Sequence, residues 1–289
     1  MKITIQNEQL KAVFDDKGAE LQSLYNTGLN IEYMWSGDAA FWGKYSPVLF
    51  PVVGSFKADT YLYKGKKYHL PRHGFAREKI FQVEKTSDSE LVFTLTQDEN
   101  TLTVYPFRFN LKIRYTLLTD TLTCSYEVNN PDEDELYLSI GAHPAFAVPM
   151  VNDTVYADYY LAFNKNEILN RWKLADGLIG TGTEAVITNN NRLPLSYELF
   201  YEDAIVIKNM ESNCITLGSD KHPHGLDFKF KDFPFFGIWA SKNASFVCLE
   251  PWCGIADSIN HNQELTEKEG IISLPPEASW QRSWSVHCF

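Results

Sequence analysis

The sequence has no surplus of positive charge. Its 26 lysines and arginines are outnumbered by 37 aspartates and glutamates, which gives a formal net charge of −11 at pH 7. The basic residues are scattered, whereas a nucleic-acid-binding protein needs a basic patch to neutralise phosphates. The same acidity opposes binding to an anionic membrane surface. We therefore expect neither a nucleic acid nor a membrane as a partner.

Long apolar runs and paired cysteines are also missing. No apolar stretch approaches the roughly 18 residues of a membrane-spanning helix, and Met1–Glu8 lacks the apolar core of a secretion signal. The five cysteines are odd in number and follow no disulfide-framework spacing. These absences predict a cytoplasmic protein with reduced thiols.

Motifs for cofactors and metals are absent as well. The glycine-rich stretch Gly177–Thr183 has neither the lysine of a phosphate loop nor the setting of a dinucleotide fingerprint. His222-Pro223-His224 does not supply the four closely spaced ligands of a structural zinc site. No Gly-x-Ser-x-Gly elbow of a serine hydrolase occurs. We expect no cofactor and no metal.

Aromatic residues are plentiful, with 19 Phe, 15 Tyr and 7 Trp. They favour strands, and their flat apolar faces are suited to sugar rings. In the segment from Phe107 to Leu117, aromatic and aliphatic residues alternate with polar ones, as in a half-buried antiparallel strand. Ten similar runs of strand-forming residues recur along the chain: 10–14, 91–96, 122–128, 136–140, 204–207, 214–217, 236–240, 246–249, 271–274 and 280–287.

Helical periodicity is scarce, and only Ala39–Lys44 and Ser196–Tyr201 suggest short helices. The acidic run Asp132–Glu135 follows a proline and is typical of a solvated loop. Many short strands without alternating helices favour an all-β fold, a large antiparallel β-sandwich. Because all-β domains reach this size as one unit, residues 1–289 are predicted to form a single domain.

Ionisable residues stand among glycine, proline and aromatic residues in three segments: 70–77, 139–146 and 248–254. Glu250 follows the apolar run 246–249, so we expect it at the end of a central strand, either in a structural ion pair or facing a cleft. His143 and His73 are each either hydrogen-bonded structural histidines or functional groups. Together, two imidazoles and one carboxylate form a set that can move protons near neutral pH.

The ordered motifs resemble the aldose 1-epimerase (galactose mutarotase) family, and specifically its LacX-like branch. The resemblance covers nearly the whole chain. The segments that carry it are Phe50-Pro-Val-Val-Gly54, Leu70-Pro-Arg-His-Gly-Phe-Ala-Arg77, Gly141-Ala-His-Pro-Ala-Phe146, Phe236-Gly-Ile-Trp239 and Leu249-Glu-Pro-Trp252.

This resemblance implies a cytoplasmic isomerase that interconverts the α and β anomers of an aldose. Glu250 matches the general base that takes the proton of the anomeric hydroxyl. His143 matches the general acid that protonates the ring oxygen, and His73 matches the histidine that holds this oxygen. The implied partner is a small sugar, and the expected assembly is a monomer or homodimer.

Substrate binding is implied for Arg72, Arg77, Asp203 and Trp252. Asp203 corresponds to a substrate-binding aspartate and is otherwise a turn residue. Ser55 replaces an arginine of the galactose-type enzymes, so a preference for galactose is not expected. Arg72 and Arg77 are shared in part with hexose-6-phosphate mutarotases, in which arginines hold the phosphate, and Arg72 has the alternative of an acidic partner.

Two other functions compete with a mutarotase. A non-catalytic sugar-binding protein would need no acid–base set of this kind. A glycoside-cleaving enzyme uses two carboxylates that flank the scissile bond, and only Glu250 stands in a clear motif. A free aldose is the favoured substrate, with a sugar 6-phosphate as the alternative.

Overall fold

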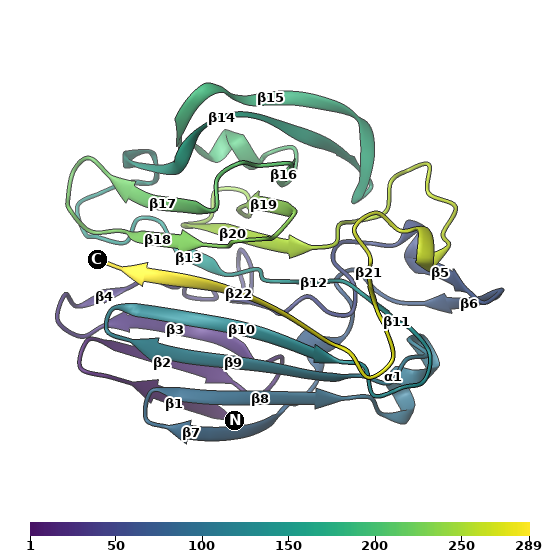
Figure 1. Ribbon diagram of the computed structural model, residues 1–289. Helices are drawn as coiled ribbons and strands as arrows, with labels where there is room; N and C mark the ends of the chain where they lie inside the picture. Colours follow the sequence, from purple (N-terminus) through teal and green to yellow (C-terminus); the bar gives the residue numbers. More distant parts are fainter.

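Antiparallel strands make up most of the protein in the computed structural model, which describes residues 1–289 (Figure 1). The largest sheet has 14 strands. Its hydrogen-bonded order is β12-β20-β19-β16-β14-β17-β18-β22-β10-β9-β8-β7, with β13 on β20 and β15 on β14. A second sheet has the order β1-β2-β3-β4, and β11-β21 and β5-β6 form two small sheets. The fold is therefore all-β, and the predicted antiparallel β-sandwich is confirmed.

The elements of the N-terminal half have the following bounds: β1 Lys2–Gln6, β2 Leu10–Asp15, β3 Glu20–Asn26, β4 Ile31–Glu32, β5 Thr60–Tyr63, β6 Lys66–His69, β7 Gln82–Ser87, β8 Glu90–Thr96, α1 Glu99–Val104, β9 Asn110–Leu118, β10 Thr121–Asn129, β11 Leu136–Leu138, β12 Ile140–Gly141 and β13 Ala145–Ala147. Those of the C-terminal half are β14 Tyr159–Ala175, β15 Leu178–Pro194, β16 Ile205–Lys208, β17 Cys214–Ser219, β18 Leu226–Lys229, β19 Phe235–Trp239, β20 Phe246–Cys253, β21 Ile272–Leu274 and β22 Ser279–Cys288. Short 3-10 helices span Lys57–Asp59, Ala76–Glu78, Tyr156–Asp158, Tyr197–Phe200 and Leu265–Glu267.

The strands β9 and β10 show why the sequence adopts a sheet. Buried residues alternate with partly exposed or exposed ones along both strands, so that one face of each is apolar. This face packs against the β1–β4 sheet. In the contact, the ring of Phe14 on β2 lies 4.5 Å from that of Tyr115 on β9 and 6.0 Å from that of Phe93 on β8, measured between centroids. Aromatic pairs at such distances stabilise the packing of the two layers.

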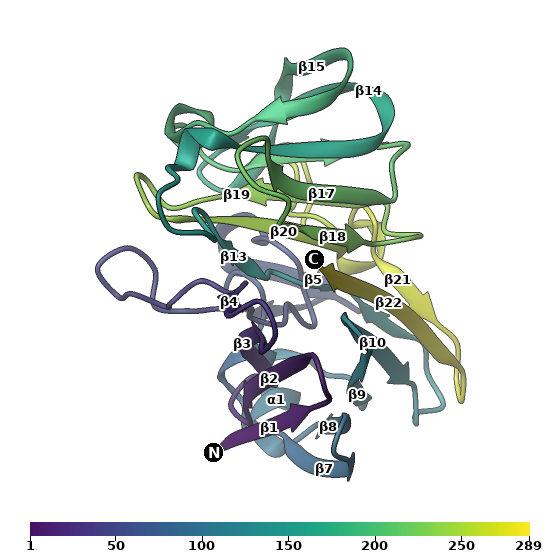
Figure 2. The same cartoon turned by 90° about the vertical axis from the view of Figure 1, so that its left-hand side faces the viewer.

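The C-terminal half of the large sheet carries the long hairpin β14–β15, which arches over β16 and β19 (Figures 1 and 2). The pairing of its strands shifts register between Ala162 and Glu167 and again between Trp172 and Leu174. Such irregularities bend a ribbon. In both views the hairpin lies at the opposite end of the molecule from the β1–β3 strands.

Two expectations about local structure are wrong. Ala39–Lys44 is not a helix: the Phe41 and Trp42 amides donate to the Asp38 carbonyl, and the chain then leaves this single turn. The second wrong expectation is the end of the strand 246–249, which continues through Glu250 to Cys253. The Pro251 carbonyl accepts a hydrogen bond from the Ala142 amide, so the proline does not interrupt the pairing. The expected helix at Ser196–Tyr201 corresponds to a 3-10 helix at Tyr197–Phe200.

The five cysteines form no disulfide with one another, and four of them are buried. None of the helices is long and apolar enough to cross a membrane.

Candidate functional site

A cavity of about 330 Å³ opens where β19 and β20 meet the loops before β7 and between β12 and β13. All seven residues singled out in the sequence contribute to its wall: Arg72, His73, Arg77, His143, Asp203, Glu250 and Trp252. The structure thus brings together side chains from four distant segments of the chain. The remaining lining residues are Trp42, Ala204 and Trp239.

Glu250 lies in the middle of β20, a strand in which every residue is buried. In register it faces Gly237 of β19, over which the Trp252 ring lies. The residue is 1% exposed and no lysine or arginine lies within ion-pair distance of it. The sequence-based expectation of a strand end is corrected here: Glu250 reaches the cavity from inside the sheet.

His143 lies opposite Glu250 because β12 and β13 both pair with β20 in one continuous register, which places position 143 across from position 250. The Ala142 amide donates to the Pro251 carbonyl at 3.1 Å, and the Leu249 amide donates to the Pro144 carbonyl at 3.2 Å. These two bonds bracket His143 and direct it toward the carboxylate. Its Nε2 lies 3.2 Å from Oε2 of Glu250.

The surroundings of the pair shift both pKa values in favour of the uncharged forms. Burial raises the pKa of the Glu250 carboxyl well above its ordinary value, and the positive charge of Arg72 opposes this rise. Burial, with smaller contributions from the charges of Arg72 and Arg77, lowers the pKa of His143 to about 3. In both cases the low-dielectric surroundings disfavour the charged form. These shifts favour a protonated carboxyl beside a neutral imidazole, and transfer of that proton from Glu250 to His143 gives the alternative ion-pair state.

His73 has a left-handed backbone, with φ of 67°, and is tied twice to Gly54. Its amide donates to the Gly54 carbonyl at 2.9 Å, and the Gly54 amide donates to its Nδ1 at 3.2 Å. On the other side of the ring, Nε of Arg72 lies 3.2 Å from Nε2. Burial, followed by the charge of Arg72, lowers the pKa of His73 well below its ordinary value.

A neutral imidazole has one accepting and one donating nitrogen, so it cannot accept from both neighbours. The Gly54 amide is fixed by the backbone, whereas the Arg72 side chain belongs to an exposed residue that can rotate. We therefore assign Nδ1 of His73 as the acceptor and place the proton on Nε2. A ligand that accepts a hydrogen bond from Nε2 would therefore take the position that the Arg72 side chain now occupies.

Neither Arg72 nor Arg77 has a carboxylate within 4 Å, so the expected acidic partner of Arg72 is not found. Arg77 donates from Nη2 to the Arg72 carbonyl at 2.9 Å, while its Nε is buried without a partner. Burial lowers the pKa of the Arg77 guanidinium. Two cations without counterions at one wall provide hydrogen-bond donors for hydroxyl, carboxylate or phosphate oxygens.

Asp203 also lines the cavity and has a φ of 145°, a conformation that side-chain-bearing residues rarely adopt. Its Oδ1 accepts from the Ala204 amide at 2.7 Å, which leaves the second oxygen available. The negative charge of Asp203 contributes to the raised pKa of Glu250.

Trp252 fits between glycines of the two neighbouring strands. A side-chain carbon on Gly237 would lie 2.4 Å from the Trp252 ring, and one on Gly141 would lie 2.7 Å from it. Glycine at both positions is therefore needed for the ring to lie across the sheet. Its indole Nε1 is buried without a hydrogen-bond partner.

Two tryptophans of the wall were not identified as site residues from the sequence. The Trp42 ring stacks on His143 with centroids 5.0 Å apart, and Trp239 meets His143 edge-on at 5.6 Å. Trp239 lies in the motif 236–239 that carries the resemblance, which is a usable signal. Trp42 follows a single turn, and its only local signal is an aromatic pair, Phe41-Trp42, beside a glycine.

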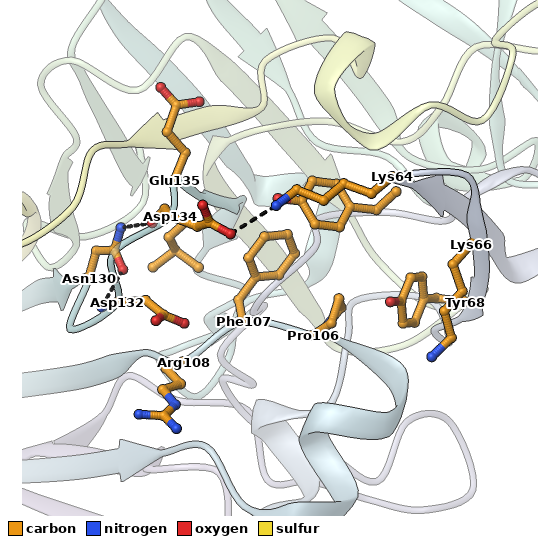
Figure 3. Close-up of a pocket in the computed structure, with 12 residues that line it drawn as sticks. Lys64, Lys66, Tyr68, Pro106, Phe107, Arg108, Asn130, Asp132, Asp134 and Glu135 are labelled. Carbon is orange, nitrogen blue, oxygen red and sulfur yellow. Dashed lines mark hydrogen bonds and ion pairs between the residues drawn. The ribbon is translucent and has the colours of Figure 1, made fainter.

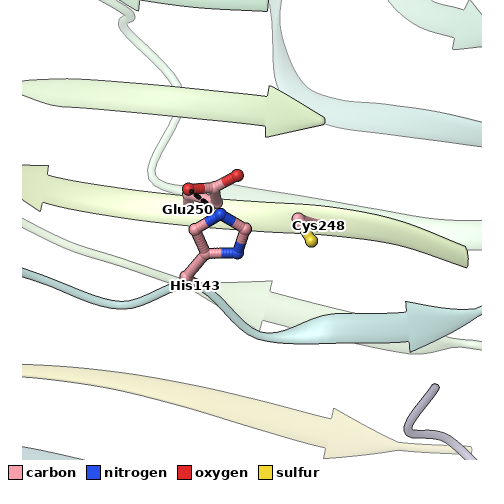
Figure 4. Close-up of side chains that lie close together, drawn as sticks. All are labelled: His143, Cys248 and Glu250. Carbon is pink, nitrogen blue, oxygen red and sulfur yellow. Dashed lines mark ion pairs between the residues drawn. The ribbon is translucent and has the colours of Figure 1, made fainter. Parts of the chain in front are cut away.

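Cys248 lies next to the pair on β20 (Figure 4). Ligand atoms of His143, Cys248 and Glu250 come within 4.8 Å of one another, a spacing that invites a metal. Burial raises the pKa of the Cys248 thiol well above its ordinary value, whereas metal binding requires the thiolate. The trio therefore fits a proton-transfer pair above a buried thiol better than a metal site.

A second groove, of about 360 Å³, lies between the β5–β6 hairpin and the loop that contains Asp132–Glu135 (Figure 3). Lys64 pairs with Asp134 there at 2.8 Å, and this acidic run is largely exposed, as expected for a loop. The Phe107 ring at its centre is 5% exposed. Without a histidine, this groove lacks the acid–base chemistry of the first cavity.

Comparison with known proteins agrees with this geometry. The model of the family described as aldose 1-epimerase matches residues 1–281. Protein LacX of Lactococcus lactis subsp. lactis is 31% identical over 296 residues, which cover 99% of this chain and 99% of that protein.

Two solved structures are similar over the whole chain. A galactose mutarotase related enzyme from Lactobacillus acidophilus is 33% identical with a TM-score of 0.95, covering 100% of this chain and 97% of that chain. A galactose mutarotase-like protein from Lactobacillus casei ATCC 334 is 34% identical with a TM-score of 0.94, covering 100% of both chains.

Proposed function

The chain belongs to the aldose 1-epimerase family, and we propose that it interconverts the α and β anomers of a free aldose by acid–base ring opening. The observation that carries this proposal is the 3.2 Å separation of His143 Nε2 and Glu250 Oε2 in a cavity also faced by His73. The two sugar oxygens involved, O1 and O5, are bonded to the same carbon. Neighbouring base and acid groups therefore match neighbouring reacting atoms.

Ring opening needs one proton removed and one proton supplied, and the pair holds the proton required. When this proton moves from Glu250 to His143, the pair becomes a carboxylate and an imidazolium. The carboxylate takes the proton of the O1 hydroxyl, and the O1–H electrons form the C1=O1 double bond. The C1–O5 bond breaks, and O5 takes the proton of His143.

The products of this step are an open-chain aldehyde, a protonated Glu250 and a neutral His143. Rotation about C1–C2 presents the other face of the aldehyde, and the same steps in reverse close the ring. The total number of protons on the pair does not change during the cycle. A pair that holds one proton therefore suits the reaction. The raised pKa of Glu250 and the lowered pKa of His143 favour such a pair.

His73 is assigned to the ring oxygen. Its Nε2–H, set by the Gly54 amide on the other nitrogen, donates a hydrogen bond to O5 as negative charge develops there. The Trp42, Trp239 and Trp252 rings supply apolar faces for the sugar ring. Asp203, with one carboxylate oxygen uncommitted, is assigned to a sugar hydroxyl.

A sugar 6-phosphate is the second candidate substrate. It is favoured by one specific observation: neither Arg72 nor Arg77 has a carboxylate partner. Arginine pairs can hold a phosphate through parallel hydrogen bonds. Against this candidate, the net charge of −11 repels anions at long range.

The decisive experiment follows anomer exchange by NMR over a panel of aldoses and their 6-phosphates. Exchange that depends on Glu250 supports the proposal and ranks the substrates. A protein that binds a sugar in the cavity without accelerating exchange is a binding protein, and this outcome refutes the proposal.

A further inference from the structure

Asp257 and Lys268 form an ion pair in the interior of the protein, outside the cavity. Lys268 Nζ lies 2.7 Å from Asp257 Oδ1, and both side chains are completely buried. The ammonium also lies 5.0 Å from the ring centre of Phe56. Burial lowers the pKa of Lys268, and Asp257 opposes this shift. Such a pair often adds little net stability, because both ions lose their hydration.

Asp257 binds two other segments through its remaining polar atoms. Its Oδ2 accepts from the Lys57 amide at 2.9 Å, and its own amide donates to the Ser55 carbonyl at 2.9 Å. Its carbonyl accepts from the Ile179 amide at 2.8 Å, near the tip of the β14–β15 hairpin. His261 Nδ1 lies 3.4 Å from Oδ2 but accepts from the Gln263 amide instead.

The Ser55–Lys57 segment leads directly to the site. Gly54 precedes it with a φ of 72°, and a side-chain carbon there would lie 2.5 Å from Cβ of Ala256. The backbone of Gly54 therefore rests on the residue next to Asp257. The Gly54 amide donates to Nδ1 of His73, and its carbonyl accepts from the His73 amide. A shift of the 54–57 segment would move the group that selects the tautomer of His73.

We propose that Asp257, neutralised by Lys268, is a positioning residue that holds the Gly54 amide against His73 and keeps the Nε2 proton directed into the cavity. The role in turnover rests on the proposed function, whereas the effect on the His73 ring does not. A buried carboxylate suits this task because it accepts from a backbone amide and from Lys268 at once. Lys268 keeps the carboxylate charged in a place where an unpaired charge would be costly.

Two single variants and one double variant test the proposal. Lys268→Met leaves the carboxylate without its counterion, and Asp257→Ala removes the acceptor of the Lys57 amide. The double variant Asp257→Asn/Lys268→Met removes both charges but keeps an amide oxygen for the Lys57 amide. Glu167→Gln is the matched control: this carboxylate is also buried and accepts from the Ser212 backbone amide at 2.6 Å, outside the cavity.

The first measurement is the ¹⁵N NMR spectrum of His73 without a ligand, assigned by its loss in His73→Gln. In the parent protein we expect an unprotonated Nδ1 and a protonated Nε2. In both single variants we expect mixed tautomers of His73 or a broadened ring signal. In the double variant and in the Glu167→Gln control we expect the spectrum of the parent. A parental spectrum in folded single variants overturns the proposal, whatever the activity.

The second measurement is anomer exchange in the same variants. We expect kcat to fall roughly tenfold or more in the single variants, with KM changed much less, because misplacement of a positioned donor affects the transition state most. The double variant should recover to within about threefold of the parent. If the parent shows no exchange, the proposed function fails while the NMR result still decides the positioning role. If the single variants do not fold, a second double variant, Asp257→Ala/Lys268→Met, decides the question. It lacks both charges and also lacks the acceptor of the Lys57 amide. Parental His73 signals in both double variants would overturn the proposal.

Discussion

His143 Nε2 lies 3.2 Å from Glu250 Oε2, although His143 belongs to the connection between β12 and β13 and Glu250 to the strand β20. The backbone hydrogen bonds from Ala142 to Pro251 and from Leu249 to Pro144 enclose this contact. The connection that carries His143 is thereby hydrogen-bonded to β20 on both sides of the histidine. Sites built on rigid elements hold reactive groups more accurately than loops do, and the first prediction tests this pair directly.

Replacement of Glu250 by Gln should remove most of the turnover and leave sugar binding largely intact. The amide keeps the shape of the carboxylate but cannot take the O1 proton. Loss of a general base costs roughly 10² or more in rate, which is about 3 kcal/mol of barrier. Anomer exchange by NMR and sugar binding by calorimetry measure the two effects. Near-parental exchange in Glu250→Gln would refute the assignment of the base.

The histidines should respond differently to substitution. His143→Asn is expected to reduce exchange more than His73→Asn, since the proposed function assigns proton donation to His143 and the hydrogen bond to the ring oxygen to His73. His73→Gln adds a finer test: the Gln amide nitrogen can occupy the place of Nε2, whereas Asn can only replace the Nδ1 acceptor. We therefore expect His73→Gln to be the more active of the two. A greater loss at His73 than at His143 would reverse the assigned roles.

The free energy of unfolding of Glu250→Gln should increase relative to that of the parent as the pH rises. The folded parent has a raised Glu250 pKa, so this group favours the folded state below its unfolded pKa of about 4.3. The contribution is lost as the pH rises through the folded value. Gln carries no such dependence. Thermal unfolding at pH 5 and pH 8 should show that the melting temperature of the variant, relative to that of the parent, is higher at pH 8 than at pH 5. A difference that is the same at both pH values would show that the carboxyl pKa is not raised.

The pH profile of exchange should depend on Arg72. The charge of Arg72 opposes the raised pKa of Glu250 and contributes to the lowered pKa values of His143 and His73. Without this charge all three pKa values rise. Arg72→Ala should therefore move both limbs of the kcat/KM profile to higher pH, while Lys173→Ala, on the β14–β15 hairpin, should leave them in place. An unmoved profile in Arg72→Ala would show that this charge does not act on the pair.

Substrate choice can be decided with the two arginines. For a free aldose as substrate, kcat/KM for glucose or galactose should equal or exceed that for the 6-phosphates. Arg72→Ala and Arg77→Ala should then affect both classes similarly. A preference of roughly a hundredfold for a 6-phosphate, about 2.7 kcal/mol, that disappears when either arginine is removed would establish the phosphorylated substrate instead.

Gly237→Ala should damage the site through Trp252. A methyl group at this position would overlap the Trp252 ring at 2.4 Å, so the ring or the strand must move. Overpacking of this kind costs about 1–3 kcal/mol. Gly182→Ala is the control, because the nearest neighbour of its added carbon is a flexible lysine at 3.8 Å. Denaturant unfolding and sugar binding should both be impaired in the first variant, and equal effects in the two variants would count against the steric argument.

The strands that alternate apolar and polar residues could be predicted from the sequence, and β9 and β10 show why: one face is buried. The β14–β15 hairpin was not predicted, because its sequence does not alternate apolar and polar residues in this way. Most side chains of β15 are exposed, so its sequence lacks the apolar period. The helix α1 was missed because it is only six residues long, although Asp98 and Thr101 form a capping box at its start.

The residues of the site could be named, but their arrangement could not. Pro251 suggested that the strand ended before Glu250, since proline cannot donate to a sheet. In the fold its carbonyl still accepts from Ala142, and the strand continues. The network behind His73 was invisible for another reason. Asp257 and Lys268 stand in an ordinary polar stretch, and only the folded chain brings their side chains together and places Asp257 against Ser55.

Under the proposed function, the β14–β15 hairpin separates the part of the protein that would discriminate between sugars from the part that would carry out the chemistry. Its tip reaches the site at Gly177, where a side-chain carbon would lie 3.7 Å from Arg72 Nη1 and from Ser55 Oγ, yet the hairpin supplies neither His143 nor Glu250. Its exposed residues are under little packing constraint. Mutations that accumulate there can remodel the rim around Arg72 while the proton-transfer pair stays unchanged, so related chains can diverge in the sugars they admit through a segment that tolerates change.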